Sequence, residues 1–402
     1  RKLDSGVMCP SYRVTKEEKD LVRGRANTLR LALSNQLPKD SFVSKEMYQT
    51  MELCVSCKAC QRECPMSVDM AKMKSEFLSH YYKKFSMGLK DTVISNMPKL
   101  IWLLKITNPI INKLNKLPLF SQIIEWFGFS SKRNLPVVEN QSPLREIYST
   151  QPNLEKKVIL FADTFNINFE IKNLMYAIKV LNKFGYQAII PSFQNDNLDR
   201  PLCCGRTYIS LGQLDKAKQE LERFTQYIYD YSYFDLPVVG IEPSCLLTFN
   251  DEFKSLSNLK GRDKIKNTFF LLEEFVLNEI KNGNKVKPKE FKQKVLIHGH
   301  CHQKSQNRVK GLTGLLNELQ ISNHLIDSSC CGMAGSFGYD TKHYDISKKM
   351  AHLSLIPTIK KSEDNEYLVA NGTSCRHQIS DFSDKKPKHI SELLFNLFET
   401  IN

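Results

Sequence analysis

Four cysteines between residues 54 and 64 carry the clearest chemical signal in the chain. Cys54, Cys57, Cys60 and Cys64 stand in the sequence C-V-S-C-K-A-C-Q-R-E-C-P, which is C-x2-C-x2-C-x3-C-P. Three thiolates spaced in this way on a tight turn can converge on three corners of one iron–sulfur cube. The fourth precedes a proline that cannot continue the turn, so we expect its sulfur to point elsewhere. The spacing predicts a [4Fe–4S] cluster and electron transfer, with zinc or a disulfide as the alternatives.

Cys9 is the candidate for the fourth ligand of this cluster. In two-cluster ferredoxins the last cysteine of such a motif ligates the other cluster, and a distant Cys-Pro completes the first. Cys9-Pro10 fits that role. Cys64 would then serve a second cluster, whose three other cysteines should lie upstream of Cys9. The chain begins at Arg1 without them, so we expect it to be a C-terminal piece of a longer protein. A free thiol in a flexible terminus is the alternative for Cys9.

Cysteine pairs recur in two similar segments of the C-terminal half. Apolar runs alternate there with helical patterns, which is typical of parallel α/β layers. The expected strands cover residues 157–162, 187–191, 237–241, 295–298, 324–327 and 367–370. The expected helices cover residues 169–184, 311–320 and 341–353. The cysteines follow corresponding strands in both segments, so we interpret the segments as an internal repeat.

The second copy holds four thiols that should meet. Ligands bind beyond the carboxyl ends of parallel strands, and every cysteine of the repeat follows a strand. The expected set is Cys301, Cys330, Cys331 and Cys375, which could hold a cluster or a zinc ion. Adjacent cysteines fit one cube poorly, which indicates an unusual cluster or a redox dithiol.

Glycines and histidines flank these thiols. Gly332 and Gly335 would let the backbone approach a cofactor closely, and Gly205 has the matching position in the first copy. His300 and His302 flank Cys301 and could ligate or relay protons, with orientation of neighbouring groups as an equal alternative. The G-M-A-G-S-F-G stretch lacks a nucleotide fingerprint, and the chain lacks a Walker A motif.

The first copy is less complete. Its cysteines are Cys203, Cys204 and Cys245, and we assign Asp163 to the place that matches Cys301. The Asp163 carboxylate is a candidate fourth ligand. Loss of the cluster from this copy is the interpretation we favour.

The composition restricts compartment and partners. The chain has 402 residues, enough for two or three domains, and twelve cysteines that indicate metal ligation in a reducing compartment rather than a disulfide scaffold. The net charge of +14 reflects a general excess of lysine, and no basic stretch is interleaved with aromatic residues, which argues against nucleic-acid binding. No apolar run spans a bilayer. We expect a cytoplasmic protein, with peripheral association with the inner membrane as an alternative.

Residues 97–130 contain both tryptophans in short amphipathic pieces. Such pieces can lie in a membrane interface, but helices packed between domains are the favoured interpretation. Elsewhere, Thr15 and Glu18 form a capping-box pattern, and helical periodicity covers residues 21–34 and 68–84.

These patterns predict an α/β protein whose all-helical ferredoxin-type domain precedes two tandem α/β repeats with parallel strands. The expected domains are 1–95 (helical, 4Fe–4S), 96–150 (helical linker), 151–252 (repeat 1), 253–293 (connector with one helix) and 294–402 (repeat 2).

The C-C-G pairs with their trailing S-C resemble the cysteine-rich "CCG" domain. This domain occurs in heterodisulfide reductase, in the iron–sulfur component of anaerobic glycerol-3-phosphate dehydrogenase, and in the iron–sulfur components of glycolate and lactate oxidases. Longer strings, such as R-G-R-A-N-T-L-R-L-A-L, H-G-H-C-H and C-C-G-M-A-G-S-F-G, resemble the C-terminal half of large FAD-linked oxidases that act on D-2-hydroxy acids.

The resemblance implies an oxidoreductase component that carries [4Fe–4S] clusters. FAD would be held by a flavin dehydrogenase domain, upstream in the same polypeptide or in a separate polypeptide. D-lactate or D-2-hydroxyglutarate would be oxidised there, and electrons would pass through the clusters to a quinone or other acceptor. Two alternatives remain: thiol–disulfide catalysis at the CCG cysteines, as in heterodisulfide reductase, and a zinc-stabilised scaffold without redox activity.

Overall fold

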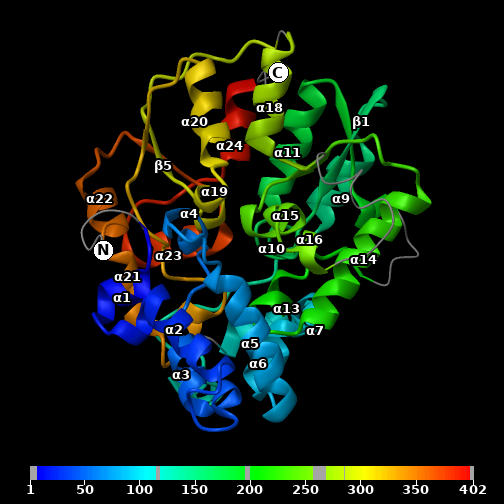
Figure 1. The fold of residues 1–402 in the computed structure, drawn as a ribbon. Helices are drawn as coiled ribbons and strands as arrows, with labels where there is room; N and C mark the ends of the chain where they lie inside the picture. Colours follow the sequence, from blue (N-terminus) through cyan, green and yellow to red (C-terminus); the bar gives the residue numbers. More distant parts are fainter. Residues whose placement is uncertain (1–6, 115–117, 195–199, 257–268, 285, 399–402) are drawn as a thin grey trace.

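The computed structural model describes residues 7–114, 118–194, 200–256, 269–284 and 286–398. It combines many helices with two parallel β-sheets. In Figure 1 the N-terminal helices, in blue, lie below two α/β units, one in green and one in yellow to red. The N-terminal helices therefore contact both units, as the contacts below show in detail.

The N-terminal part is entirely helical. Its elements are α1 (Pro10–Thr15), η1 (Glu18–Asp20), α2 (Val22–Leu33), η2 (Ser41–Val43), α3 (Lys45–Glu52), α4 (Ala59–Glu63) and α5 (Met70–Lys84). The helices expected at residues 21–34 and 68–84 are confirmed. The capping box at Thr15 is wrong, because Thr15 ends α1 and its hydroxyl donates a hydrogen bond of 2.7 Å to Asp20.

A buried arginine holds these short helices together. Arg25 on α2 is 1% exposed. Its guanidinium donates to the carbonyl oxygens of Asp20 (2.6 Å) and Thr50 (3.0 Å) and to the hydroxyl of Ser11 (3.2 Å). One side chain thus ties α1, η1 and α3 to α2. Its planar set of donors suits it to several partners at once.

The segment between the N-terminal helices and the first sheet forms α6 (Leu89–Ser95), α7 (Met97–Leu114), α8 (Pro118–Trp126) and α9 (Ser142–Ser149). Part of it packs on the second α/β unit: Ser130 N–H donates to the Tyr339 carbonyl (2.7 Å), and Arg133 donates to Gln378 (2.6 Å). Trp102 and Trp126 are 58% and 81% exposed. No helix among the described residues combines the length and apolar character needed to cross a membrane.

The first α/β unit contains a parallel sheet in the order β2-β1-β3-β4. Its strands are β1 (Lys156–Phe161), β2 (Tyr186–Ile189), β3 (Val238–Gly240) and β4 (Phe269–Leu271). Its helices are α10 (Thr164–Phe169), α11 (Ile171–Lys183), α12 (Pro191–Gln194), α13 (Arg206–Ser210), α14 (Leu214–Asp230), α15 (Pro243–Asn250) and α16 (Phe253–Leu256). The three strands predicted in this segment are confirmed.

The expected connector at residues 253–293 is wrong in part. Phe269–Leu271 adds strand β4 to the first sheet, pairing with β3, and α18 (Leu272–Lys281) follows at once. The apolar run that spans both elements has no break in its pattern, so it resembled one helix. Residues 257–268, also within the expected connector, lie outside the described residues.

The second α/β unit contains a parallel sheet in the order β6-β5-β7. Its strands are β5 (Val295–His298), β6 (Asn323–Leu325) and β7 (Tyr367–Ala370), as predicted. Its helices are α19 (Cys301–Ser305), α20 (Val309–Glu318), η3 (Phe337–Tyr339), α21 (Tyr344–Ala351), α22 (Leu355–Lys361), α23 (Thr373–Phe382) and α24 (Ile390–Phe398).

The two units share one hydrophobic core. Leu174 on α11, Val276 on α18, Leu315 on α20 and Leu393 on α24 are all fully buried in the same cluster. Figure 1 shows these four helices side by side between the sheets. The units are therefore held as one body, and the carboxyl ends of their strands keep a fixed relation.

Buried charges fix the N-terminal helices on the first unit. Lys58 is 1% exposed, and its ammonium lies 2.8 Å from a Glu252 carboxylate oxygen and also contacts Asp251. Arg206 on α13 pairs with the same Glu252 at 2.7 Å. On the other side, Arg62 donates to the carbonyl of Lys304 in the second unit (3.0 Å). Charges this deeply buried are tolerated only when paired, so the arrangement sets the docking geometry.

A substitution at Gly212 tests how the N-terminal helices dock on the first α/β unit. It has φ +71°, and a Cβ atom there would lie 2.6 Å from the backbone nitrogen of Ser79 on α5. We expect Gly212→Ala to lower the free energy of unfolding by about 2–4 kcal/mol, because it adds a backbone clash to the cost of a left-handed conformation. Gly185→Ala is the matched control, since Gly185 has φ +88° with open space around it, and it should cost only about 1 kcal/mol. Denaturant titration measures both values. Equal losses in the two variants would show that α5 does not press on Gly212.

Candidate functional site

The first group of thiols comes from the N-terminal helices. Cys9, Cys54, Cys57 and Cys60 line one small cavity. Cys9 precedes α1 with extended backbone, and Pro10 occupies the first turn of that helix. The expected approach of Cys9 to the 54–60 motif is therefore what the structure shows, although Cys9 lies more than forty residues away in the sequence.

Left-handed residues shape the loop that presents these sulfurs. Ser56 has φ +50° and Lys58 has φ +58°, so the chain reverses direction on either side of Cys57. Such residues cost about 1–2 kcal/mol each outside glycine and persist where the surroundings demand them. The N–H of Met70 donates to the Cys60 sulfur at 3.4 Å. A donor aimed at a sulfur favours its thiolate form, which is the form that binds metal.

Cys64 lies apart from this cavity, as its spacing predicts. It ends α4, and its N–H donates to the Cys60 carbonyl (2.9 Å). The neighbouring Glu63 accepts hydrogen bonds from the N–H groups of Val7 (2.8 Å) and Met8 (3.0 Å). The segment that leads to Cys9 is thus anchored on the cysteine motif.

The second group of thiols lies beyond the carboxyl ends of β5, β6 and β7. The four sulfurs expected in this copy are in contact. A hydrogen bond with Cys330 lowers the pKa of Cys301 to about 6, and one with Cys331, together with burial, raises the pKa of Cys375 well above its usual value. Closely packed thiols cannot all ionise against one another. A metal cation at this place would remove that obstacle, so the donor set fits a metal cluster.

His298 is a site residue that the sequence analysis did not single out. It ends β5 and is 1% exposed. One of its ring nitrogens and the sulfurs of Cys331 and Cys375 all lie within 4.8 Å of one another. Its Nδ1 lies 3.0 Å from the Ser328 hydroxyl, whereas its Nε2 has no hydrogen-bond partner among the described nitrogen and oxygen atoms. Burial lowers the pKa of His298 to about 4, so the imidazole is neutral. The sequence pattern that could have indicated this site residue is H-G-H-C-H, in which His298 is the first histidine.

His300 and His302 have different roles from one another. His300 caps α19, because its Nδ1 accepts the N–H of His302 at 3.2 Å. His302 extends to the other thiol group, with its Nε2 3.1 Å from the carbonyl of Ser56. Neither contact makes these histidines ligands. His302 joins the helix that begins at Cys301 to the loop between Cys54 and Cys57.

The predicted glycines also differ. Gly332 has φ +86° and its N–H donates to the Cys330 sulfur at 3.4 Å, while an added Cβ would lie 2.6 Å from the Ser347 carbonyl. Gly335 has φ +65° and donates to the Ser374 hydroxyl (3.3 Å) with open space around it. In the first unit, Gly205 donates to the Cys203 sulfur at 3.4 Å, which matches Gly332.

The third group of thiols lies in the first unit. Cys203, Cys204 and Cys245 are all buried, and hydrogen bonds join Cys204 to both of the others. The N–H of Arg206 donates to the Cys204 sulfur at 3.4 Å. Hydrogen bonding to Cys204 and burial raise the pKa of Cys203 well above its usual value. This group repeats the arrangement of the second unit with one thiol fewer.

The position that matches Cys301 holds Thr164, so the assignment of Asp163 is wrong by one residue. Asp163 is the N-cap of α10, as His300 is the N-cap of α19. The Asp163 carboxylate accepts the N–H groups of Phe165 and Asn166, both at 3.0 Å, and is therefore committed to the helix. Thr164 occupies the next position, where its hydroxyl lies 3.7 Å from the Cys203 sulfur.

The first and second groups of thiols are neighbours. Burial and then the nearby Cys301 raise the pKa of Cys57, which joins the two groups electrostatically. One cavity is lined by Cys54 on the N-terminal side and by Cys301, Cys330 and Cys331 on the other. The contact from His302 to Ser56 crosses the same boundary.

A buried carboxyl group supports the loops of the second unit. Glu273 on α18 is 1% exposed and accepts hydrogen bonds from Gln303 (2.7 Å) and Asn371 (2.9 Å). Gln303 follows Cys301 on α19, and Asn371 begins the loop that leads to Cys375. Burial, and secondarily Glu274, raise the pKa of Glu273 to about 8.

Comparison with known families agrees with these groups. A family described as "4Fe-4S dicluster domain" matches residues 6–68, and a family described as "Cysteine-rich domain" (CCG) matches residues 295–380. The chain thus contains an iron–sulfur domain and a CCG domain, as the sequence resemblance implied. The first range covers Cys9 and the 54–64 motif, and the second covers all four thiols of the second unit.

Several proteins similar to this chain are dehydrogenases or parts of them. D-2-hydroxyglutarate dehydrogenases of Haemophilus influenzae and Pseudomonas putida are 21% and 23% identical over 98% and 96% of this chain. The chain spans only 42% and 41% of their lengths. One component of the anaerobic glycerol-3-phosphate dehydrogenase of Escherichia coli is 22% identical, over 71% of each chain.

Thr164→Cys should complete the ligand set of the first unit. Because Thr164 has the position of Cys301, we expect the variant to bind about four more iron atoms per chain. Asp163→Cys is the matched control, and it should lose about 1 kcal/mol of stability through the lost cap and gain no iron. Iron and sulfide analysis of anaerobically purified protein measures the difference. Iron gained only by the Asp163 variant would show that Asp163, and not Thr164, has the position of Cys301.

Glu273→Gln should remove a pH dependence of stability. The pKa of Glu273 is 4.5 when exposed and about 8 when folded, so its contribution is present below pH 4.5 and is lost as the pH rises toward 8. Glutamine keeps an oxygen acceptor without a charge. We expect the variant to be more stable than the parent by a few kcal/mol above pH 8, with the advantage vanishing at acid pH. Free energies of unfolding measured across this pH range check the prediction. The same pH dependence in the variant and the parent would contradict it.

Proposed function

We propose that the chain is the iron–sulfur electron-transfer module of an FAD-linked D-2-hydroxyacid dehydrogenase. The observation that carries the proposal is the adjacency of two complete sets of four thiols, one around Cys57 and one around Cys301. A cluster in each set supplies one-electron transfer at a potential set by its surroundings. Two such sets in contact form a path for electrons. A single structural metal would need only one set.

The residues of this chain hold and insulate that path. The proposed ligands are Cys9, Cys54, Cys57 and Cys60 in the first set, and Cys301, Cys330, Cys331 and Cys375 in the second. Met70 and Gly332 donate N–H groups to sulfur, which stabilises thiolate charge and tunes potential. Apolar side chains around both sets exclude water. Cys64 is proposed to serve a further cluster.

The finer architecture is also a proposal. We infer an N-terminal ferredoxin-type domain (1–95), a helical linker (96–150) and two CCG repeats, the first extended beyond residue 252 by β4 and the second at 294–402. The matched contacts of Gly205 and Gly332 with the first cysteine of each pair support the repeat. The first repeat is proposed to have lost its cluster with the exchange of a thiol for Thr164.

The partners follow from the relatives. This chain spans only about two fifths of the D-2-hydroxyglutarate dehydrogenases to which it is similar. That partial coverage supports a flavin partner that holds FAD and oxidises the hydroxy acid. We propose a quinone as the final acceptor. The exposed Trp102 and Trp126, in a segment rich in lysine, support contact with a membrane surface on the cytoplasmic side. Twelve cysteines without a disulfide fit a reducing compartment.

Cys57→Ser and Cys331→Ser test the two cluster sites separately. We expect each to lower the iron content by about four atoms per chain and to abolish a different electron paramagnetic resonance signal. In the parent, the reduced signals should broaden each other because the sites are adjacent, and each variant should lose that broadening. Cys245→Ser is the control and should leave iron unchanged. A colourless protein that contains zinc would refute the proposal in favour of the scaffold alternative.

A further inference from the structure

An apolar groove lies between the N-terminal helices and the first α/β unit. It has a volume of about 790 Å³. One wall comes from α2 and α5 and the other from α13, α14 and α16. Its apolar lining includes Ala26, Leu29, Leu33, Phe42, Met73, Phe77, Ile209, Leu214 and Leu256. Pockets of this size with mostly apolar walls are typical of small-molecule sites.

The inner end of the groove touches the first group of thiols. Ser56, which lies between Cys54 and Cys57 in the ligand loop, lines the groove. Ala71 also lines it and follows Met70, whose N–H lies 3.4 Å from the Cys60 sulfur. A molecule at this end is thus separated from the proposed cluster by the ligand loop alone. Such closeness is what electron transfer from the cluster to a bound molecule requires.

The polar part of the lining includes Ser56 and the Arg206–Glu252 pair, which lie next to the ligand loop. The Ser56 hydroxyl has no hydrogen-bond partner within the described part of the chain, although the Ser56 carbonyl is held by His302. Arg206 also lines the groove, but its guanidinium is paired with Glu252, which lines the groove beside it (2.7 Å). The Ser56 hydroxyl is the group that can donate to a ligand oxygen, and such an oxygen accepts more strongly as it gains negative charge on reduction.

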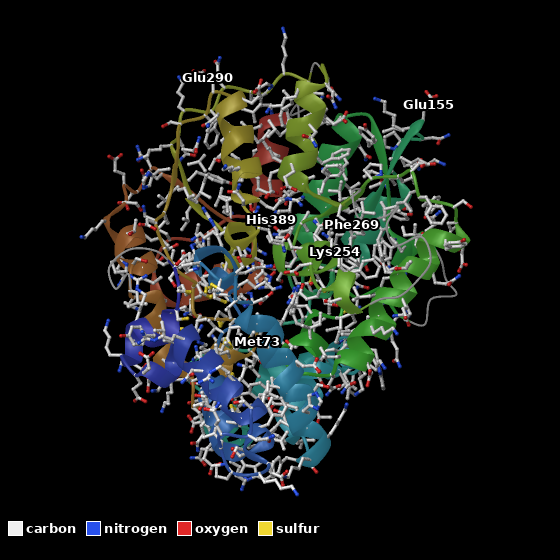
Figure 2. The ribbon with its side chains drawn as sticks, in the orientation of Figure 1. Met73, Glu155, Lys254, Phe269, Glu290 and His389 are labelled. Atoms are coloured by element: carbon white, nitrogen blue, oxygen red, sulfur yellow. The ribbon has the colours of Figure 1, made fainter. Side chains whose placement is uncertain are left out.

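Exposed apolar side chains stand at the open side of the groove, among the exposed polar residues Arg30, Ser34 and Glu76. Leu33 and Met73 line it and are 67% and 41% exposed. Figure 2 shows Met73 on α5, between the blue N-terminal helices and the green helices of the first unit. The groove therefore combines a hydroxyl donor beside the ligand loop with a largely apolar lining, which suits a ring with carbonyl groups and a hydrocarbon tail.

We propose that this groove binds the ring of a quinone and is the place where the module delivers its electrons. The inference rests on the proposed function, because the electrons come from the flavin partner as it oxidises a hydroxy acid to a keto acid. Two electrons pass from the Cys54–Cys60 site to the ring. Two protons from water at the open mouth convert both carbonyl oxygens to hydroxyls, so the quinone becomes a hydroquinone.

Two variants close the groove in different ways. Ala26→Trp fills it from α2, and Asn27→Trp is its control, since Asn27 is the next residue and is exposed outside the groove. Met73→Asp places a charge at the mouth, and Leu89→Asp is its control on the exposed surface of α6. Asn27, Met73 and Leu89 are exposed, Ala26 is half-buried, and none of the four is a proposed ligand.

The experiment uses the full chain, purified anaerobically, with a short-chain ubiquinone as the probe. Equilibrium dialysis measures its binding, and stopped-flow absorbance measures the rate at which it reoxidises dithionite-reduced protein. We expect Ala26→Trp and Met73→Asp each to weaken binding and slow reoxidation about tenfold or more, with both controls unchanged. Reoxidation by ferricyanide, a hydrophilic acceptor, should stay at the parent rate in all variants.

The outcomes separate this inference from the proposed function. Protein that contains iron but shows no saturable quinone binding, or binds it equally in all variants, would overturn the groove assignment alone. Protein that lacks iron yet binds quinone in a manner blocked by Ala26→Trp would refute the electron-transfer function and leave the binding site standing. Equal losses in Leu89→Asp and Met73→Asp would place the quinone on the outer surface of the helices instead, and would overturn the assignment as well.

Discussion

Desolvation of sulfur is the constraint on which the rest of this structure depends. Nine of the twelve cysteines are buried, and burial opposes the thiolate form that binds metal. A protein core accepts so many thiols in contact only if something offsets their charge. The backbone N–H groups of Met70, Gly205, Arg206 and Gly332 offset part of it. Bound iron would offset the remainder. The stability of the folded chain would then depend on its metal content.

The parallel sheets meet this constraint by geometry. Strands that run in one direction end at one edge, and loops there carry sulfur without interrupting the sheet. Helices that begin at the same edge aim their first N–H groups at the ligands. The N-terminal helices have no sheet, and they use left-handed residues at Ser56 and Lys58 to obtain a similar convergence. Two unrelated local solutions thus bring their sulfurs to a common boundary, at Cys57 and Cys301.

Much of this was predictable from the sequence, and the failures have physical reasons. The cysteine spacings and the short apolar runs at residues 295–298 and 367–370 are local signals, so they predicted the ligand groups and strands. Strand β4 was missed because Phe269–Leu271 runs directly into α18 with no turn residue between them. Asp163 was assigned by its place directly after the strand predicted at residues 157–162, whereas the helix that follows begins at Thr164 and the Asp163 carboxylate accepts backbone N–H groups. His298 and the groove beside Ser56 depend on contacts between distant segments, which no local pattern contains.

One carboxylate links helices of the two α/β units that share a core. Glu242 caps α15 in the first unit through Ser244 N–H (3.1 Å), and its second oxygen accepts the N–H of Thr373 at the start of α23 in the second (2.8 Å). Glu170 reaches across the same boundary to the hydroxyl of Thr373 (2.7 Å). The first unit, with Thr164 at the place of Cys301, therefore supports the helix that leads to Cys375 whether or not it holds a metal. Without the first unit, the N–H and the hydroxyl of Thr373 would lose these two acceptors.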